Sequence, residues 1–476
     1  MTRKLALLAL AGALQSLLVA SFCHALLPPP GVATWANEAE RGVAAAQYRL
    51  GRAYDEGDGV ATDPARAAGW LRKAATQGNV DAQVYLGTLL ARGRGVTADP
   101  AEAAFWYQRA AEAGSSLAAY NLGLLYYGGD GVDRDQTAAL RWFERAAVAG
   151  DVSAAHFAGL LYLEGKGTKR DPEAAFRAIA AAARSGVPRA QYDLAAMYSQ
   201  GVGIAANPLL ARDWYRRAAE QGVPEAASAY GFMLAHGVGG PADPVAAVGY
   251  LRNGALAGDT AAEEQLAFMY ATGSGMKRNW GEAASRYRSL AEGGNASAQY
   301  NLANLLMDPP VGTPDYQGAA YWLLRAAATG EPRAQYNLGA LHKAGLGVPR
   351  DAVAAAAWYL RAAEQGSAEA QLAIAGLYYQ GDGVPLNYDT ALQWFRAAAA
   401  QGSASAQAAI AVMYERGLGV RRDPIVAHAW LSVAADSGDD GARRRLSVFD
   451  GGLSSAERVQ AEQMKHRLVA ALRDGQ

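Results

Sequence analysis

Residues 334–366 read AQYNLGALHKAGLGVPRDAVAAAAWYLRAAEQG, and the same pattern returns every 36 residues along most of the chain. The chain aligns on itself at this step without insertion or deletion from residue 46 to residue 438. A fixed period of about 20–50 residues is typical of proteins built from stacked repeats. The sequence therefore predicts eleven copies of one 36-residue unit over residues 46–441.

Two positions of the unit hold only small residues. Small side chains at fixed helix positions let neighbouring helices approach closely, and a larger side chain inserted there costs about 1–3 kcal/mol. The unit therefore predicts tight helix packing. One position is occupied by Gly51, Gly87, Gly123, Gly159, Ala195, Gly231, Ala267, Ala303, Gly339, Ala375 and Ala411, and the other by Ala67, Ala103, Ala139, Ala175, Ala211, Ala247, Ala283, Ala319, Ala355, Ala391 and Ala427.

Each unit also carries signals for two helices. A first helix such as residues 82–92 ends at Gly93-Arg94-Gly95, because glycine tolerates the left-handed conformation of a helix end. An Asp or Asn then stands where its side chain can cap the next helix. One helix pair cannot bury its own apolar face, so the pairs must stack into an all-α, right-handed superhelical solenoid with terminal caps. The predicted N-caps are Asp63, Asp99, Asp135, Asp171, Asn207, Asp243, Asn279, Asp315, Asp351, Asn387 and Asp423.

The unit A-Q-x-x-L-G-x-x-Y-x-x-G-x-G-V-x-x-D-x-x-x-A-x-x-W-Y-x-x-A-A-x-x-G, nearly complete at residues 334–366, resembles the Sel-1-like repeat, a relative of the tetratricopeptide repeat. The resemblance implies a scaffold or adaptor that binds other proteins and is not an enzyme. Bacterial members of the family include periplasmic regulators and factors for envelope or exopolysaccharide processes. Some cysteine-rich members are associated with β-lactam binding or hydrolysis, but their repeats carry disulfide pairs that this chain lacks.

The N-terminus has the pattern of an export signal. The basic pair Arg3 and Lys4 precedes an apolar run over residues 5–20, and small residues favour cleavage after Ala25. An uncleaved anchor or a lipoprotein signal around Cys23 are alternatives; the run is short for an anchor, and a large residue precedes the cysteine. We therefore expect residues 1–25 to be a signal peptide and the mature chain to be periplasmic or secreted, from a Gram-negative bacterium.

Both ends of the repeat array have cap-like sequences. Residues 26–45 are predicted to be a linker and an N-terminal capping half-repeat, and residues 442–476 to be C-terminal capping helices. Ser454 and Glu457 match a capping box, in which each residue bonds to the backbone of the other. The apolar residues of the last helix that are expected to lie against repeat eleven are Met464, Leu468, Ala471 and Leu472.

Composition gives little support to catalysis, cofactors or nucleic acid. The 44 basic and 45 acidic residues nearly cancel, so no global field favours nucleic acid. The only cysteine, Cys23, leaves with the predicted signal, which removes thiolate metal sites and thiol nucleophiles. Residues 164–168, EGKGT, lack the glycine and hydroxyl spacing of a phosphate loop. The chain is therefore predicted to use no cofactor and no metal.

Several other polar residues are expected to be surface features. We expect His156 and His236 to be surface or groove residues, and the pair Glu263-Glu264 to be a solvated helix face. Two arginine clusters, at residues 421–422 and 443–445, could meet an anionic glycan or lipid surface, although exposed arginines need no ligand.

The most variable positions of the unit are the candidates for binding. In related helix-pair solenoids the first helices line the concave face. Slots two, three, six, nine and ten, counted from the opening alanine of each repeat (Ala46, Ala82 and every 36 residues onward), should then face a groove. The predicted ligand is a helix or peptide of a protein partner, and a glycan is the alternative ligand. No membrane insertion of the mature chain is predicted. A second interpretation is that the apolar residues at these positions simply fill a tightly wound superhelix. The candidate groove residues are Leu124, Tyr127, Leu160, Leu163, Phe232, Phe268, Asn304 and Met307.

Overall fold

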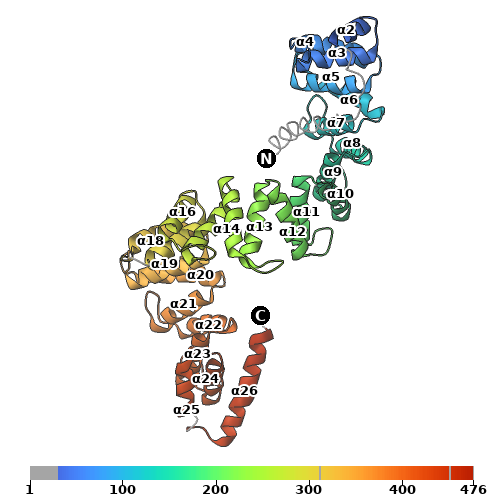
Figure 1. Cartoon of the computed structure of the whole chain (residues 1–476). Helices are drawn as coiled ribbons and strands as arrows, with labels where there is room; N and C mark the ends of the chain where they lie inside the picture. The colour runs from blue at the N-terminus through green and yellow to red at the C-terminus, as the bar shows by residue number, and fades with distance from the viewer. Residues whose placement is uncertain (1–30, 310–311, 450–451, 475–476) are drawn as a thin grey trace. The chain divides into compact units, whose positions relative to one another are not determined.

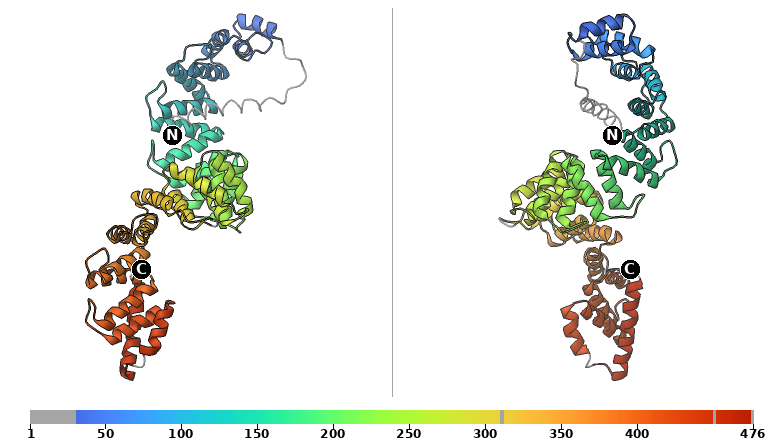
Figure 2. Two further views of the ribbon diagram at one scale, coloured as in Figure 1. Left: turned by 90° about the vertical axis from the view of Figure 1, so that its left-hand side faces the viewer. Right: turned by 45° about the vertical axis from the view of Figure 1, so that its right-hand side comes forward.

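The computed structural model describes residues 31–309, 312–449 and 452–474, which contain helices and no strand. The predicted all-α solenoid is confirmed. Two compact units divide between Asp259 and Thr260, and in each of them consecutive helices pack in chain order (Figures 1 and 2). The first unit contains α2 (Val32–Glu40), α3 (Ala44–Glu56), α4 (Pro64–Thr76), α5 (Val80–Arg92), α6 (Pro100–Glu112), α7 (Ser116–Gly128), α8 (Gln136–Val148), α9 (Val152–Glu164), α10 (Pro172–Arg184), α11 (Pro188–Gln200), α12 (Pro208–Glu220), α13 (Pro224–His236) and α14 (Pro244–Leu256).

The second unit begins at the seventh repeat and ends with two further helices. No helix in the described part of the chain combines the length and the apolar character that a membrane span requires. The predicted signal peptide, residues 1–25, lies outside the described residues. The helices of this unit are α15 (Thr260–Thr272), α16 (Trp280–Glu292), α17 (Ala296–Met307), α18 (Tyr316–Ala328), α19 (Pro332–Ala344), α20 (Ala352–Glu364), α21 (Ala368–Gln380), α22 (Tyr388–Ala400), α23 (Ala404–Arg416), α24 (Pro424–Asp436), α25 (Asp440–Phe449) and α26 (Ser455–Asp474).

The predicted caps set the start of every second helix. Asp99 accepts a hydrogen bond of 2.9 Å from the backbone amide of Glu102 at the start of α6. The corresponding Asp or Asn accepts such a bond in all eleven repeats. Each cap contributes about 1 kcal/mol to the helix that it begins. This prediction is confirmed throughout the array.

The small residues of the repeat lie where the two helices of a pair touch. A Cβ atom on Gly123 would lie 2.7 Å from the ring of Phe143, which is fully buried on the facing helix α8. The constant alanine, such as Ala139, is also fully buried. The predicted tight packing between the helices of a pair is therefore confirmed.

Most loops between the two helices of a repeat have two glycines, of which the first ends a helix. The second has a different role, which the sequence does not reveal. Gly203 has φ +71° and lies against the backbone of Pro172, the first residue of α10 in the preceding repeat. An added Cβ would overlap the carbonyl oxygen of Pro172. This glycine therefore lets one repeat approach the next. The same contact is made by Gly95, Gly131, Gly167 and Gly239 in the first unit and by Gly347 and Gly383 in the second.

A buried glutamine also joins successive repeats. The side-chain amide of Gln191 on α11 donates a hydrogen bond of 3.2 Å to the carbonyl of Ala183, near the end of α10. The same carbonyl oxygen also accepts a hydrogen bond of 3.0 Å from the backbone amide of Gly186, so the glutamine adds a second bond to the end of the preceding helix. Equivalent bonds of 3.0–3.4 Å are made by Gln47, Gln83, Gln299, Gln335, Gln371 and Gln407.

A second glutamine completes this junction in only some repeats. Gln221, which follows α12, donates a hydrogen bond of 2.7 Å to the side-chain oxygen of Gln191. Gln77, Gln365 and Gln401 do the same for Gln47, Gln335 and Gln371. Where the second position holds another residue, the buried oxygen has no hydrogen-bond partner among the described residues, as at Gln83, Gln299 and Gln407.

We expect Ala113→Gln to stabilise the second repeat. The new amide would reach the unpaired oxygen of Gln83, and a hydrogen bond of this kind contributes about 0.5–1.5 kcal/mol. Native-state hydrogen exchange of the amides in α5 and α6 measures the gain. Ala149→Gln is the matched control, because the facing position holds Ala119, which offers no acceptor. Equal protection in the two variants would contradict the explanation.

The two ends of the described chain are covered by additional helices. Ala39 of α2 packs with Ala46 and Leu50 of α3. At the other end α25 and α26 both pack against α24, whose residues from Ala427 to Ala434 are all buried.

The predicted capping box is present, since Ser454 Oγ accepts a hydrogen bond of 3.3 Å from the amide of Glu457, whose carboxylate accepts one of 2.8 Å from the amide of Ser454. Leu468 and Leu472 pack on the core, whereas Ala471 is exposed, because it lies on the outer face of the helix.

Candidate partner-binding groove

The candidate groove residues of repeats three and four are largely packed against neighbouring helices. Leu124 of α7 is only 9% exposed and belongs to the core. The ring of Tyr127 meets the ring of Phe157 edge-on, with centroids 6.3 Å apart. Leu160 and Leu163 of α9 are half-buried against the core formed by α10 and α11. These four residues therefore contribute mainly to packing and offer a partner only part of their surface.

Phe232 differs from these residues because it is open to solvent. It occupies slot six of α13 and is 49% exposed. Its ring stacks on His236 with centroids 4.1 Å apart, and His236 Nδ1 lies 2.9 Å from the carbonyl oxygen of Phe232. The two stacked rings form an exposed aromatic pair on the sixth repeat. A surface of this kind is available to an apolar side chain of a partner.

The remaining candidates belong to the second unit. Phe268 occupies slot six of α15 and is 47% exposed. The side chain of Asn304 accepts a hydrogen bond of 3.0 Å from Asn337, and Met307 is half-buried against the core. Phe268 is therefore the exposed apolar candidate of the second unit, as Phe232 is of the first.

A buried pair formed by His156 and Asp193 was missed by the sequence analysis. His156 occupies slot two of α9 and is buried, so the expectation of a surface or groove residue was wrong. Its Nε2 lies 2.6 Å from Asp193 Oδ2, in slot three of α11. The pair joins the first helices of two successive repeats. The two residues are 37 positions apart, one more than the repeat period, and this spacing was the available signal.

The acidic pair at the start of repeat seven is also engaged. Both carboxylate oxygens of Glu263 accept hydrogen bonds of 2.8 Å from Arg286. Glu264 accepts one of 3.3 Å from Asn295 and another from Ser297. The expected solvated face is therefore wrong for both side chains. Arg286 stands where most repeats have tryptophan, and it provides the cation that Glu263 contacts.

Several tyrosines of the first helices have a raised pKa. Burial raises the pKa of Tyr48, Tyr120 and Tyr192, which share slot two. The hydrogen bond that Tyr162 donates to Glu144 raises the pKa of Tyr162 to about 12. No group of three or more His, Cys, Asp and Glu in the described residues is arranged to hold a metal ion.

Comparison with known proteins agrees with this architecture. The family model of the Sel1 repeat matches eleven successive segments, from residues 44–79 to residues 404–439. A protective antigen of uropathogenic Escherichia coli with an SLR fold is 31% identical, with a TM-score of 0.81 over 93% of this chain and 95% of that one. A Sel1 repeat protein from Oxalobacter formigenes is 30% identical, with a TM-score of 0.39 over 82% and 97%. No curated protein shows significant similarity in sequence.

Proposed function

Because the chain belongs to the Sel1 repeat family, we propose that it is a periplasmic or secreted scaffold that binds a protein partner through its first helices. Sel1- and tetratricopeptide-like repeat proteins are generally scaffolds for protein interaction, and they are typically not catalytic. The proposed cellular setting is the bacterial envelope, including exopolysaccharide processes. The export pattern of residues 1–25 supports the location.

The exposed ring of Phe232 is the observation on which the binding surface rests. Most large apolar side chains of the first helices in this unit are packed, whereas about half of Phe232 faces solvent. Complete burial of such a side chain contributes about 1.5–3 kcal/mol, so covering the exposed half of Phe232 contributes about half of this to binding. A partner helix or peptide that places an apolar residue on Phe232 and His236 would gain most of this free energy at one point, as hot spots in interfaces do.

We expect Phe232→Ser to reduce partner capture at least about tenfold, the effect of losing one central aromatic contact. The measurement is crosslinking of the tagged full chain in the native cell envelope, followed by mass spectrometry of the attached proteins. Phe105→Ser is the matched control, because Phe105 is 51% exposed but lies on a second helix. If Phe232→Ser captures the partner as well as the wild type does, the proposed surface is wrong.

Separate measurements test the location and the alternative functions. Export is supported if the mature protein begins at residue 26 and is found outside the cytoplasm, and it is contradicted by an intact N-terminus in the cytoplasm. Retention on peptidoglycan or exopolysaccharide, with no protein captured, would favour a glycan ligand held by exposed aromatic rings. Turnover of nitrocefin by the mature chain would favour the β-lactam enzyme.

A further inference from the structure

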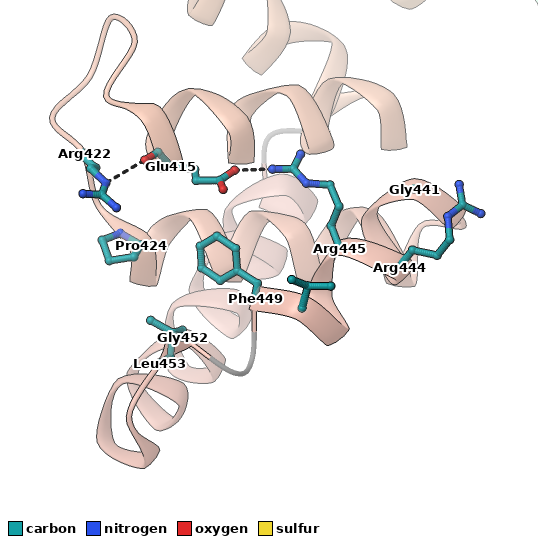
Figure 3. Close-up of a pocket in the computed structure, with 10 residues that line it drawn as sticks. Glu415, Arg422, Pro424, Gly441, Arg444, Arg445, Phe449, Gly452 and Leu453 are labelled. Atoms are coloured by element: carbon teal, nitrogen blue, oxygen red, sulfur yellow. Dashed lines mark hydrogen bonds and ion pairs between the residues drawn. The ribbon is translucent and has the colours of Figure 1, made fainter.

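The second unit has a pocket of about 770 Å³ at its C-terminal end (Figure 3). It lies between α25 on one side and the end of α23 with the following loop on the other. A volume of this size is typical of sites for small ligands or short peptide segments. The lining residues are Glu415, Arg422, Pro424, Gly441, Arg444, Arg445, Val448, Phe449, Gly452 and Leu453.

The repeat pattern explains which residues of α25 face the pocket. Ala442 is a twelfth opening alanine, and Leu446 takes the core slot. Arg444, Arg445 and Val448 then fall in slots two, three and six, the slots predicted to line a groove. Val448 is 81% exposed. One wall of the pocket is therefore built from groove positions of a first helix, and Arg444 and Val448 in this wall are exposed.

The wall of the pocket carries an excess of positive charge. Arg445 forms an ion pair with the carboxylate of Glu415, and Arg422 Nε donates a hydrogen bond of 3.0 Å to the carbonyl oxygen of the same residue. At the corresponding positions of the first two repeats, one partner is an uncharged residue, because Tyr85 donates a hydrogen bond to Asp55. The side chain of Arg444 has no hydrogen bond or ion pair with any described residue, and it is exposed. Three arginines thus face one carboxylate.

Apolar side chains complete the pocket. Leu453 is buried, Phe449 is half-buried, and both lie beside the arginines together with Val448 and Pro424. A ligand that fills this site must carry an anionic group for the arginines and an apolar group for this surface. Arginine matches a carboxylate well, because its planar guanidinium can donate two parallel hydrogen bonds.

We propose that this pocket binds a short acidic peptide segment in which a carboxylate neighbours an apolar side chain. Glu415 in the same wall favours a peptide over a phosphate group, because its carboxylate can accept hydrogen bonds from the backbone amides of a peptide, which a phosphate group does not offer. The site is independent of Phe232, which belongs to the first unit. Either proposal can therefore fail without the other.

The test uses a library of acetylated hexapeptides with Asp, Glu, Asn, Gln, Leu, Phe and Ser at every position, presented to the full chain. The wild type is expected to select peptides with Asp or Glu next to Leu or Phe. The best peptide and its amide counterpart are then measured by isothermal titration calorimetry. We expect Arg444→Glu to weaken binding of the acidic peptide at least about tenfold, through loss of a charge-assisted contact and gain of repulsion.

Two further variants make the result specific. Arg467→Glu changes the charge equally on the exposed surface of α26 and should leave binding unchanged. Glu415→Gln removes the competing carboxylate and should tighten binding severalfold. Selection without acidic residues, or equal binding by Arg444→Glu, overturns the proposal. Binding to vesicles of phosphatidylglycerol and phosphatidylcholine without binding to the selected peptide also overturns it, in favour of a lipid.

Discussion

Gly203→Ala is expected to destabilise the junction between repeats four and five by more than about 3 kcal/mol, among the largest effects of single substitutions. Two costs add at this position. A side chain in the left-handed conformation costs about 1–2 kcal/mol. The new methyl group would also overlap the backbone of Pro172, which cannot move without separating α10 from the loop. The measurement is native-state hydrogen exchange of α10, α11 and α12.

Gly222→Ala separates the two costs. Gly222 has φ +85°, similar to Gly203, but nothing lies within 4 Å of the position that a Cβ would take. We expect this control to lose only the conformational term, about 1–2 kcal/mol. If the two variants lose equal protection, the contact with the preceding repeat does not limit stability. The explanation of the loop glycine would then be wrong.

Phe143→Ala is expected to cost about 3–5 kcal/mol, the range for removing a buried aromatic ring. Phe143 is fully buried between α7 and α9, where its ring stacks on Phe157 with centroids 5.3 Å apart. Gly123 offers no side chain to fill the cavity. Urea unfolding followed by the near-ultraviolet signal, together with hydrogen exchange of α7–α9, measures the loss.

The control for this variant is Phe105→Ala. Phe105 is half-exposed, so its truncation leaves no cavity and is expected to cost less than about 1 kcal/mol. Because each repeat contacts mainly its neighbours, the loss of protection in Phe143→Ala should spread no further than the adjacent repeats. A uniform loss along the first unit would instead show that the unit unfolds as one cooperative body.

The parts of the fold that depend on local chemistry could be predicted from the sequence. Asp99 caps the helix that begins at the next residue, and Gly93 ends the preceding helix. Both helix boundaries could therefore be predicted without knowledge of another repeat. The 36-residue period then required the helix pairs to stack, since one pair cannot bury its own apolar face. The N-cap recurs in eleven repeats and the helix-ending glycine in ten of them, which is why the helix boundaries could be predicted closely.

The contacts between repeats could not be predicted in the same way. The contact of Gly203 with Pro172 and the bond of Gln191 to Ala183 depend on how closely two repeats approach, which the period does not specify. The same limit applies to the candidate groove. Slot number identified positions on the first helices, but only the packing of neighbouring helices distinguishes buried Leu124 from exposed Phe232. His156 was misjudged for this reason.

The packing of α26 against α24 has a mechanical consequence. In a stacked array each repeat is held by its neighbours alone, so a pulling force releases repeats one at a time, each lengthening the chain by roughly 100 Å. The helix α24 packs against α26 in addition to α23 and α25, the two kinds of neighbour that every inner second helix has. The C-terminal end of the second unit therefore resists extension more than the inner repeats do. A load applied there would reach the rest of the unit before this end gave way.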